Sequence, residues 1–355
     1  MEGLSQMADF FAERFDAMGW KTQKVDYAPE SGVCVVCTNR EAEHYDLMLI
    51  GHLDTVYAKG TVAERPFRIE GERAYGPGTA DMKHGCLLMY YLMKELPEDI
   101  NDKLNIVVVF NPDEEKGSFC SRKTYLEYAK KTDYVYVYEA CDNGKGARCV
   151  ERKGGAFAWV NFKGIAGHCG YMHTNGTRSA ISEMGRWIVK LDSTLHSKER
   201  NTTVNIGVVE GGTQSNVVAE HAFMRADIRF SMPEELDRVK AVFDELMQEA
   251  KEHGIEVDLK LTTKPALKPT EEGWKYIEHL KELFKENGME FIHEARGGFS
   301  DANIIAPCGP ICIDGMGPAG AECHCDREYL CIDGVIPAFD FSNLMIRDLA
   351  ENKER

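Results

Sequence analysis

Two apolar segments in the first third of the chain each end in a group of polar residues. One is Asp46-Leu-Met-Leu-Ile-Gly-His52, and the other is Leu104-Asn-Ile-Val-Val-Val-Phe110, which runs directly into Asn111-Pro-Asp-Glu-Glu-Lys-Gly-Ser118. Apolar runs of this length are typical of buried strands in a mostly parallel sheet. Because ligands of such sheets bind beyond the carboxyl ends of the strands, the polar groups that follow predict a functional site there.

The rest of the chain alternates between predicted strands and helices. Helical periodicity predicts helices at Leu4–Met18, Met82–Leu96, Ser121–Lys130, Glu271–Asn287 and Val335–Asn352, and a strand is predicted at Glu290–His293. This alternation favours an α/β fold, with a mostly parallel sheet flanked by helices. Between residues 153 and 264 the pattern changes. A strand is predicted at Val217–Phe230, and its apolar and charged residues alternate over Ala222–Phe230 as in a sheet with one wet face. We therefore expect an α+β insert at 153–264 within a domain made of 1–152 and 265–355.

Composition limits the classes of partner and the cellular location. With 355 residues, 43% of them hydrophobic and 28% charged, the chain has the composition of a globular protein. Its net charge of −16 argues against nucleic acid and against an anionic membrane as partners. The first residues lack the pattern of a signal peptide, and no apolar run approaches the roughly 20 residues of a membrane span. Reduced thiols are the default for the 12 cysteines, so we expect a cytoplasmic protein.

His52, Asp54 and Asp81 are the first candidate site residues. Side chains two apart on an extended chain point the same way, so Asp54 can accept the second imidazole N–H of His52, as a metal-bound histidine requires. Asp81 would then supply an oxygen ligand. Two plainer interpretations stay open at this point: His52 as a satisfied polar group, and Asp81 as the N-cap of a helix that begins near Met82.

Further acids and a second histidine follow predicted strands or lie in loops. Glu114 and Glu115 follow the second apolar segment, Glu139 ends a predicted strand at Tyr134–Tyr138, and His324 lies in a polar loop. Together with the first group they suffice for two divalent ions, most suitably Zn²⁺, with Mn²⁺ or Co²⁺ as substitutes. Since adjacent side chains diverge, one of the two glutamates can bind metal while the other moves a proton. The alternative is two solvated acids in a turn.

Five motifs resemble, in order and spacing, the dinuclear-zinc family of glutamate carboxypeptidase, aminoacylase, acetylornithine deacetylase, succinyl-diaminopimelate desuccinylase and peptidase T. They are the segments 51–56, 75–83, 113–118, 164–170 and 297–303. The similarity runs from about residue 5 to the end and is greatest to the glutamate carboxypeptidase branch. It implies that 1–152 and 265–355 form the catalytic domain and that 153–264 is a lid and dimerisation domain.

The resemblance also implies a role for each candidate residue. His52, Asp81 and Glu139 match the ligands of one zinc, and Asp81 bridges to a second zinc held by Glu115 and His324. Asp54 matches the acid that orients His52, and Glu114 matches the general base. The peptide bond after Asp81 is expected to be cis.

Three residues of the insert match residues that act on the substrate. His168 matches a histidine that reaches the partner subunit's site and steadies the oxyanion. Asn216 and Arg229 match residues that bind the free α-carboxylate of the substrate, a task for which a planar guanidinium is suited. Without the resemblance, Arg229 would be interpreted as a surface charge on the wet face of a strand.

The sequence therefore predicts a cytoplasmic, homodimeric, dizinc metallopeptidase of the carboxypeptidase or dipeptidase type. It would hydrolyse an amide bond in a peptide or N-acyl amino acid with a free α-carboxylate, through a metal-bridging hydroxide and the base Glu114. One alternative is a metabolic N-acyl amino acid deacylase, because the motifs are shared. The alternative from another class is a catalytically silent relative that binds peptides, which the filled ligand and base positions disfavour.

Overall fold

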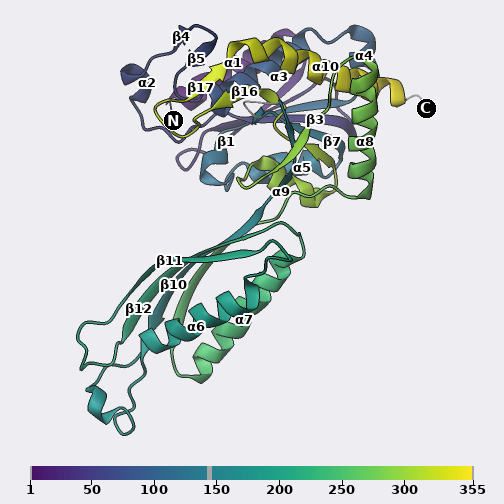
Figure 1. Ribbon diagram of the computed structural model, residues 1–355. Coiled ribbons are helices and arrows are strands. Elements are labelled where there is room, and N and C mark those ends of the chain that lie inside the picture. The colour runs from purple at the N-terminus through teal and green to yellow at the C-terminus, as the bar shows by residue number, and fades with distance from the viewer. Residues whose placement is uncertain (1, 142–145, 354–355) are drawn as a thin grey trace. The chain divides into compact units, whose positions relative to one another are not determined.

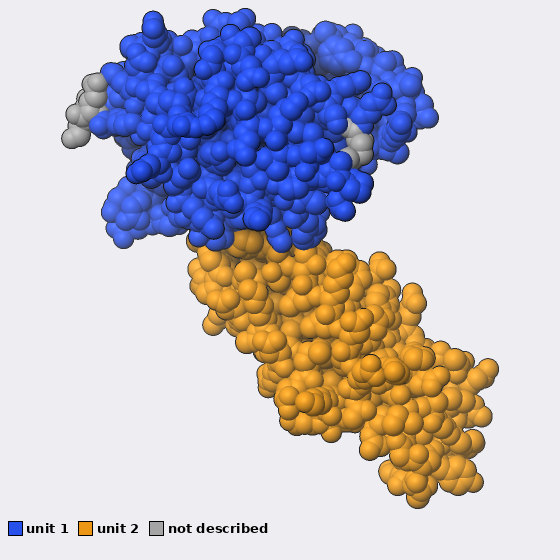
Figure 2. All heavy atoms as spheres, turned by 180° about the vertical axis from the view of Figure 1, so that it is seen from behind, with its two compact units in different colours: residues 1–150, 269–296, 300–355 blue, residues 151–268, 297–299 orange. Residues whose placement is uncertain are grey.

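The computed structural model describes residues 2–141 and 146–353, which form two compact units, coloured separately in Figure 2. Unit 1 consists of Met1–Val150, Pro269–Arg296 and Ser300–Arg355, and unit 2 of Glu151–Lys268 and Gly297–Phe299. These limits differ by a few residues from those expected at 152 and 264. The short segment Gly297–Phe299 groups with unit 2, whereas the sequence places all of 265–355 in the catalytic domain.

A six-stranded sheet forms the centre of unit 1 (Figure 1). Its strands run in the order β1 (Lys21–Asp26), β2 (Val33–Thr38), β6 (Ile106–Asn111), β3 (Tyr45–His52), β7 (Thr132–Val137) and β15 (Ile311–Ile313). The pairs β6–β3, β3–β7 and β7–β15 are parallel, and the pairs β1–β2 and β2–β6 are antiparallel. The mostly parallel sheet predicted from the apolar segments is confirmed.

Helices cover both faces of this sheet. Figure 1 shows α1, α3 and α10 on one side and α5 and α9 on the other. Apolar side chains of α1, α3, α8 and α10 form one core with strand residues such as Leu49 and Val108, which are fully buried. The bounds are α1 (Glu2–Ala17), α2 (Thr61–Glu64), α3 (His84–Lys94), α4 (Glu98–Lys103), α5 (Arg122–Ala129), α8 (Glu271–Glu286), α9 (Asp301–Ile305) and α10 (Val335–Asn352).

Two smaller sheets complete the strands outside the insert. One runs in the order β4 (Arg68–Glu70), β5 (Arg73–Tyr75), β17 (Tyr329–Cys331), β16 (Gly317–Ala321) and β8 (Ala140–Cys141), and the other pairs β14 (His293–Arg296) with β9 (Arg148–Arg152). The sequence predicts β14 at 290–293, which is wrong by three residues. It does not predict β16, because that strand contains two glycines and a proline, which weaken any local strand signal.

Unit 2 is a four-stranded antiparallel sheet with two helices packed on one face. The strand order is β11 (Thr203–Gly211), β12 (His221–Phe230), β10 (Gly154–Lys163) and β13 (Glu256–Lys264), and the helices are α6 (Ala180–Leu195) and α7 (Glu235–Glu252). Trp187 and Phe243 of these helices pack with Phe162 in the core. The alternation of buried and charged residues predicted for β12 is confirmed. The sequence extends this strand back to Val217, which is wrong, since β12 begins at His221.

Cys34 and Cys37 have the C-x-x-C spacing of many redox and zinc sites, but the fold gives them no such role. Both are free and buried in β2, where residues three apart point to opposite faces of the sheet. Burial raises the pKa of the Cys37 thiol to about 12, which keeps it protonated. Among the residues that the structure describes, no helix has both the length and the apolar character needed to cross a membrane.

Candidate metal centre

Most of the candidate residues lie at or just beyond the carboxyl ends of three neighbouring strands of the unit 1 sheet. His52 is the last residue of β3 and pairs in register with Asn111, the last residue of β6. Glu114 and Glu115 lie in a short 3₁₀ turn after β6, and Glu139 follows β7 by two residues. The polar groups at the ends of the apolar segments therefore meet because the strands that carry them are parallel neighbours.

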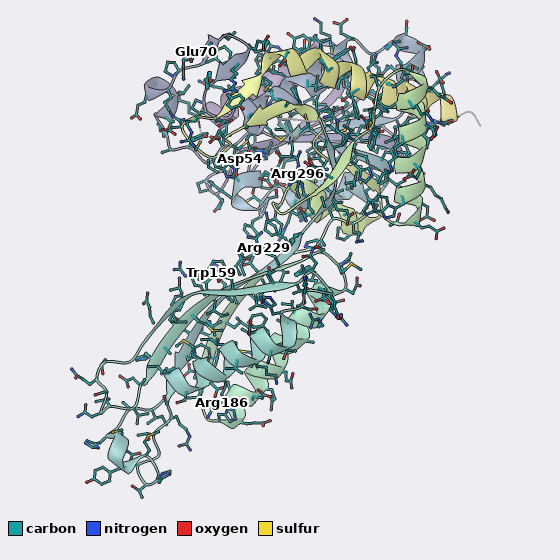
Figure 3. All side chains as sticks on the ribbon, in the orientation of Figure 1. Asp54, Glu70, Trp159, Arg186, Arg229 and Arg296 are labelled. Carbon is teal, nitrogen blue, oxygen red and sulfur yellow. The ribbon has the colours of Figure 1, made fainter. Side chains whose placement is uncertain are left out.

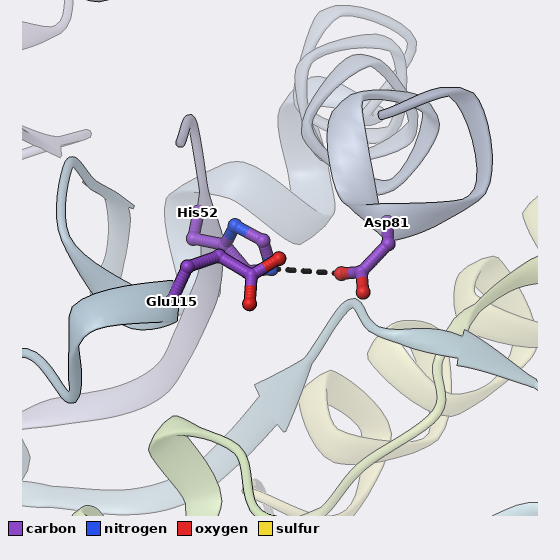
Figure 4. Close-up of side chains that lie close together, drawn as sticks. All are labelled: His52, Asp81 and Glu115. Atoms are coloured by element: carbon purple, nitrogen blue, oxygen red, sulfur yellow. Dashed lines mark hydrogen bonds and ion pairs between the residues drawn. The ribbon is translucent and has the colours of Figure 1, made fainter. Parts of the chain in front are cut away.

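Asp81 reaches the same place from a distorted turn at Thr79–Lys83. Its backbone angles (φ −130°, ψ 94°) are not helical, and the Asp81–Met82 peptide bond is cis, as the resemblance implies. Helix α3 begins at His84 with Lys83 as its N-cap, so the predicted start at Met82 is wrong and Asp81 does not cap the helix. Figure 4 shows the Asp81 carboxylate directed at His52 instead.

The two oxygens of the Asp81 carboxylate face different histidines. Oδ1 lies 3.0 Å from Nε2 of His52, and Oδ2 lies 3.0 Å from Nε2 of His324. An oxygen of Glu139 lies 3.7 Å from His52 Nε2, and an oxygen of Glu115 lies 3.4 Å from His324 Nε2. The five side chains thus form two groups of three donors that share one carboxylate.

These donor sets fit a pair of divalent metal ions. Zinc ligands at about 2.0–2.1 Å in a tetrahedron are separated by about 3.3 Å, close to the distances within each group. The Oε1 atom of Glu115 is buried and accepts no hydrogen bond, so its lone pairs are available to a cation. Ligand atoms of His52, Asp81 and Glu115 all lie within 4.8 Å of one another, as do those of His52, Glu114 and Glu139.

Asp54 lies at the second ring nitrogen of His52, as the sequence predicts, and contacts it through both its backbone and its side chain. Nδ1 of His52 lies 3.0 Å from the backbone carbonyl oxygen of Asp54 and 3.3 Å from its carboxylate. The carboxylate also accepts hydrogen bonds from the backbone N–H groups of Glu114 and Glu115, each at 3.1 Å. Asp54, which is labelled in Figure 3, therefore fixes the His52 ring and the turn that carries both glutamates.

The electrostatics of the cluster show a site with more negative than positive charge. Burial raises the pKa of Glu115 and Glu139, and the nearby Asp81 carboxylate raises both further. The hydrogen bond to Asp81 raises the pKa of His324 to about 9. Burial opposes charge on Asp81, but hydrogen bonds from His324 and His52 outweigh it and lower the pKa of this carboxyl. Without a metal ion, protons therefore supply the positive charge, and a cation would displace them.

Asp301 is a buried acid beside this site that the sequence does not single out as a site residue. Its carboxylate accepts hydrogen bonds from the Ser118 hydroxyl at 2.6 Å, the Asn111 amide at 2.6 Å and the Tyr125 hydroxyl at 3.0 Å. Asn111 and Ser118 flank the turn of Glu114 and Glu115, so Asp301 holds both ends of that turn. Its only sequence signal is its place in the motif 297–303, because its partners come from distant segments.

His168 and Asn216 lie together in unit 2. The backbone N–H of Cys169 donates to the Asn216 carbonyl at 3.0 Å, and His168 forms an isolated β-bridge with Val217. The His168 side chain is exposed, and its Nδ1 accepts the N–H of Gly170 at 3.1 Å, which leaves Nε2 to face solvent or a ligand. Both residues belong to loops beyond the 163/221 end of the β10–β12 pair.

Arg229 lies at the opposite end of β12, opposite Gly155 of β10 (Figure 3). Arg229 lies eight positions along the strand from His221, or about 27 Å at the usual rise per residue. The structure therefore does not bring Arg229 and Asn216 of one chain together. Asp227 binds the Arg229 guanidinium through Nε at 2.5 Å and Nη2 at 2.8 Å. The Cζ atom of Arg229 lies 4.4 Å from the ring centroid of Phe299.

A sequence model described as peptidase family M20/M25/M40 matches residues 48–348. The chain belongs to this family. Carboxypeptidase G2 of Pseudomonas sp. (strain RS-16) is 33% identical over 312 residues, which cover 87% of this chain and 75% of that protein. Succinyl-diaminopimelate desuccinylase of Xylella fastidiosa (strain M12) is 26% identical over 329 residues, covering 86% and 84% of the two chains.

Solved structures of other M20 proteins have the same fold. Aminopeptidase PepT from Bacillus cereus ATCC 10987 superposes with a TM-score of 0.75 at 23% identity, covering 99% of this chain and 94% of that one. The M20 metallo-carboxypeptidase Sso-CP2 from Sulfolobus solfataricus gives 0.71 at 15% identity, covering 98% and 94%. The predicted family and fold class are confirmed. This M20 chain is an enzyme, a metallohydrolase of amide bonds in peptides or acyl amino acids.

Proposed function

We propose that this M20 enzyme is a dizinc carboxypeptidase or dipeptidase that hydrolyses the amide bond before a residue with a free α-carboxylate. The observation that supports this proposal most is the Asp81 carboxylate, whose two oxygens each lie 3.0 Å from a different histidine. A carboxylate shared in this way is what a bridging ligand between two ions requires. His52 and Glu139 would hold one ion with Asp81, and Glu115 and His324 the other.

Glu114 is the proposed general base. A bound pair of divalent ions would activate a water molecule and polarise the scissile carbonyl. A carboxylate oxygen of Glu114 lies within 4.8 Å of the donor atoms of His52 and Glu139. From this position Glu114 would accept the proton of the water and pass it to the leaving amine. Asp54 keeps the turn in place by accepting the N–H groups of Glu114 and Glu115.

The different roles proposed for two adjacent glutamates give the test of this function. Glu114→Gln should lower kcat by roughly 10²–10⁴-fold and leave metal content unchanged, because it removes a proton carrier and no ligand. Glu115→Gln should lower both activity and the number of ions bound per chain. Metal analysis of the purified variants, with turnover of C-terminal dipeptides and of N-acetyl and N-succinyl amino acids, separates these outcomes. Near-normal rates for Glu114→Gln would show that the base is assigned wrongly.

The substrate panel also distinguishes this proposal from its alternatives. A metabolic deacylase would prefer one N-acyl amino acid to every dipeptide. The similarity to desuccinylases is the observation that supports this alternative. A metal-loaded protein that hydrolyses no amide in the panel would favour the silent peptide-binding relative. We place the enzyme in the cytoplasm because the 12 cysteines form no disulfide within the described residues, as expected of reduced thiols.

A homodimer is proposed because the substrate-binding candidates are divided between the ends of unit 2. Arg229 and the pair of His168 and Asn216 can act on one small substrate if they come from different chains. Strand β11 lies at the edge of its sheet, and exposed apolar residues of α6, Ile181 and Val189, are further candidates for a contact with a second copy.

Mixed dimers test this arrangement. Glu114→Gln and His168→Ala chains would each be nearly inactive alone, but coexpression should restore about a quarter of wild-type activity, because half of random dimers are mixed and hold one intact site. If the mixture is no more active than its parents, His168 acts within its own chain or not at all. Size-exclusion chromatography with light scattering serves as the control for assembly.

A further inference from the structure

Glu328 is a buried acid with no role in the site described above. It lies four residues after His324, immediately before β17, and its side chain is 1% exposed. Its carboxylate has four hydrogen-bond donors. Oε1 accepts the backbone N–H groups of Ala80 at 2.8 Å and Asp81 at 3.0 Å. Oε2 accepts the N–H of Gly78 at 3.0 Å and the hydroxyl of Tyr57 at 2.6 Å.

Three of these four donors are backbone N–H groups at or just before the turn that carries the Asp81 carboxylate: Ala80 and Asp81 lie in the turn, and Gly78 precedes it. The turn departs from helical geometry at Asp81, so its N–H groups need partners other than those an α-helix provides. Successive N–H groups directed to one point form a site for an anion, and hydrogen bonds to an ionised carboxylate are stronger than neutral ones. Glu328 therefore binds the backbone of Asp81 from the same segment that carries His324.

The Tyr57 hydroxyl links Glu328 back to the loop of His324. It lies 2.7 Å from the carbonyl oxygen of Cys325, as well as 2.6 Å from Glu328. The guanidinium of Arg65 stacks over the Tyr57 ring, with its Cζ 4.7 Å from the ring centroid, and donates to the same carbonyl at 3.3 Å. The segments of Asp81 and His324 are thus connected through one carboxylate and one hydroxyl.

We propose that Glu328 is a positioning residue for the metal centre: it fixes the Asp81 carboxylate relative to His324 and thereby sets the affinity for the ion held by Asp81, Glu115 and His324. The inference rests on the proposed dinuclear site. Glu328 itself directs both carboxylate oxygens to N–H and O–H donors. Its effect on the ion is therefore transmitted through the Asp81 backbone.

Glu328→Gln tests the proposal with little change in shape. The amide oxygen can still accept the N–H groups of Ala80 and Asp81, but the NH₂ group would then face the N–H of Gly78, donor against donor. We expect the affinity for the ion held by Asp81, Glu115 and His324 to fall roughly 10–100-fold, the range typical of residues that support metal ligands. The measurement is titration of the metal-free protein with Co²⁺, followed by its visible absorption.

Three comparisons separate positioning from general stabilisation. Glu322→Gln changes an exposed acid of the same loop that pairs with Arg327, and it should leave Co²⁺ affinity within twofold of wild type. Tyr57→Phe removes one donor and keeps the three N–H groups, so it should give a smaller loss than Glu328→Gln. Thermal unfolding of each metal-free variant reports damage to the fold separately from loss of affinity.

Wild-type Co²⁺ affinity in Glu328→Gln would overturn the proposal, even if its thermal stability were lower, because the residue would then act on the fold alone. If Glu328→Gln does not fold, an unchanged affinity in Tyr57→Phe overturns it instead. The titration uses no substrate, so it still decides the role of Glu328 if every amide tested is inert. That result would contradict the proposed function only.

Discussion

The proposed metal centre of unit 1 and the Glu235 cluster of unit 2 are both buried acidic clusters, but their charges are balanced differently. Glu235 is 1% exposed and binds Arg200 at 2.8 Å, Arg238 at 2.5 Å and the Thr202 hydroxyl at 2.8 Å. Burial opposes its charge, but these partners outweigh burial and lower the pKa of Glu235 to about 2. In unit 1 the ion-pair partners of Asp81, Glu115 and Glu139, within the described residues, are histidines.

This difference in charge balance distinguishes a cluster that stabilises the fold from one that is suited to bind a cation. Around Glu235 the protein supplies its own positive charge, so the acid is ionised at neutral pH without a ligand. Around Asp81 burial and mutual repulsion raise the pKa of Glu115 and Glu139, so the same residue type is disfavoured as an anion. Acids kept in this unfavourable state are characteristic of functional sites.

Among the changes that distinguish the two clusters, metal removal should have the largest effect on activity and on the stability of unit 1. Chelation should reduce amide hydrolysis to the uncatalysed background, and added Zn²⁺ or Co²⁺ should restore it. Saturating metal should also stabilise unit 1 by about 2.7 kcal/mol at 100 times the dissociation constant. Hydrogen exchange would localise the change: protection should fall around His52 and Asp81 and stay constant around Glu235. Equal losses in both units would contradict the contrast between them.

Arg229 gives the next largest effect and tests whether a paired charge can also bind substrate. Arg229→Lys keeps the charge but loses the planar, bidentate geometry. We expect kcat/KM to fall roughly 10–100-fold, mainly through KM, as for loss of a hydrogen bond to a charged group. Arg225→Lys is the matched control, because Arg225 lies four residues earlier in β12 and its side chain is on the same face of the sheet. Unchanged kinetics in Arg229→Lys would show that Arg229 does not bind the substrate and is a surface charge on the strand.

Glu235 gives the smallest effect, which should appear in stability alone. Glu235→Gln should lower the free energy of unfolding by roughly 1–3 kcal/mol and leave turnover per folded enzyme unchanged. The pKa of Glu235 is about 2 in the folded protein and about 4.3 in the unfolded chain. The ionised carboxylate therefore stabilises the fold fully above about pH 4.3, and this stabilisation is lost as the pH falls toward 2.

Urea unfolding at several pH values measures this loss. The difference in unfolding free energy between wild type and Glu235→Gln should shrink from pH 6 to pH 3. Glu256→Gln breaks an exposed pair with Lys163 and should change stability by less than about 0.5 kcal/mol. A difference that is constant with pH would show that Glu235 is not ionised through its arginine partners.

The sequence predicts the parts of the structure that depend on local patterns. Apolar segments that lead into His52 and Asn111 identify two buried strands, which the structure places side by side, and the polar residues beyond them identify the place where the site forms. The alternation in β12 likewise identifies its buried face. Each of these signals lies within a few residues of the feature it predicts.

What the sequence misses depends on contacts between distant segments. The turn at Asp81 ends in a helix start two residues later than predicted, because Glu328 binds its N–H groups from far along the chain. The bonds that Asp301 makes to Asn111 and Ser118 are equally distant. The strand predicted from Val217 begins only at His221, since the apolar residues Val217 and Val218 extend the strand pattern too far back.

X-ray diffraction from crystals grown with Zn²⁺ tests the dinuclear centre most directly, through the anomalous signal at the zinc edge. We expect two peaks about 3.5–4 Å apart. One should lie among His52, Asp81 and Glu139, and the other among Asp81, Glu115 and His324. A single peak, or a second peak bound by Glu114 in place of Glu115, would contradict it.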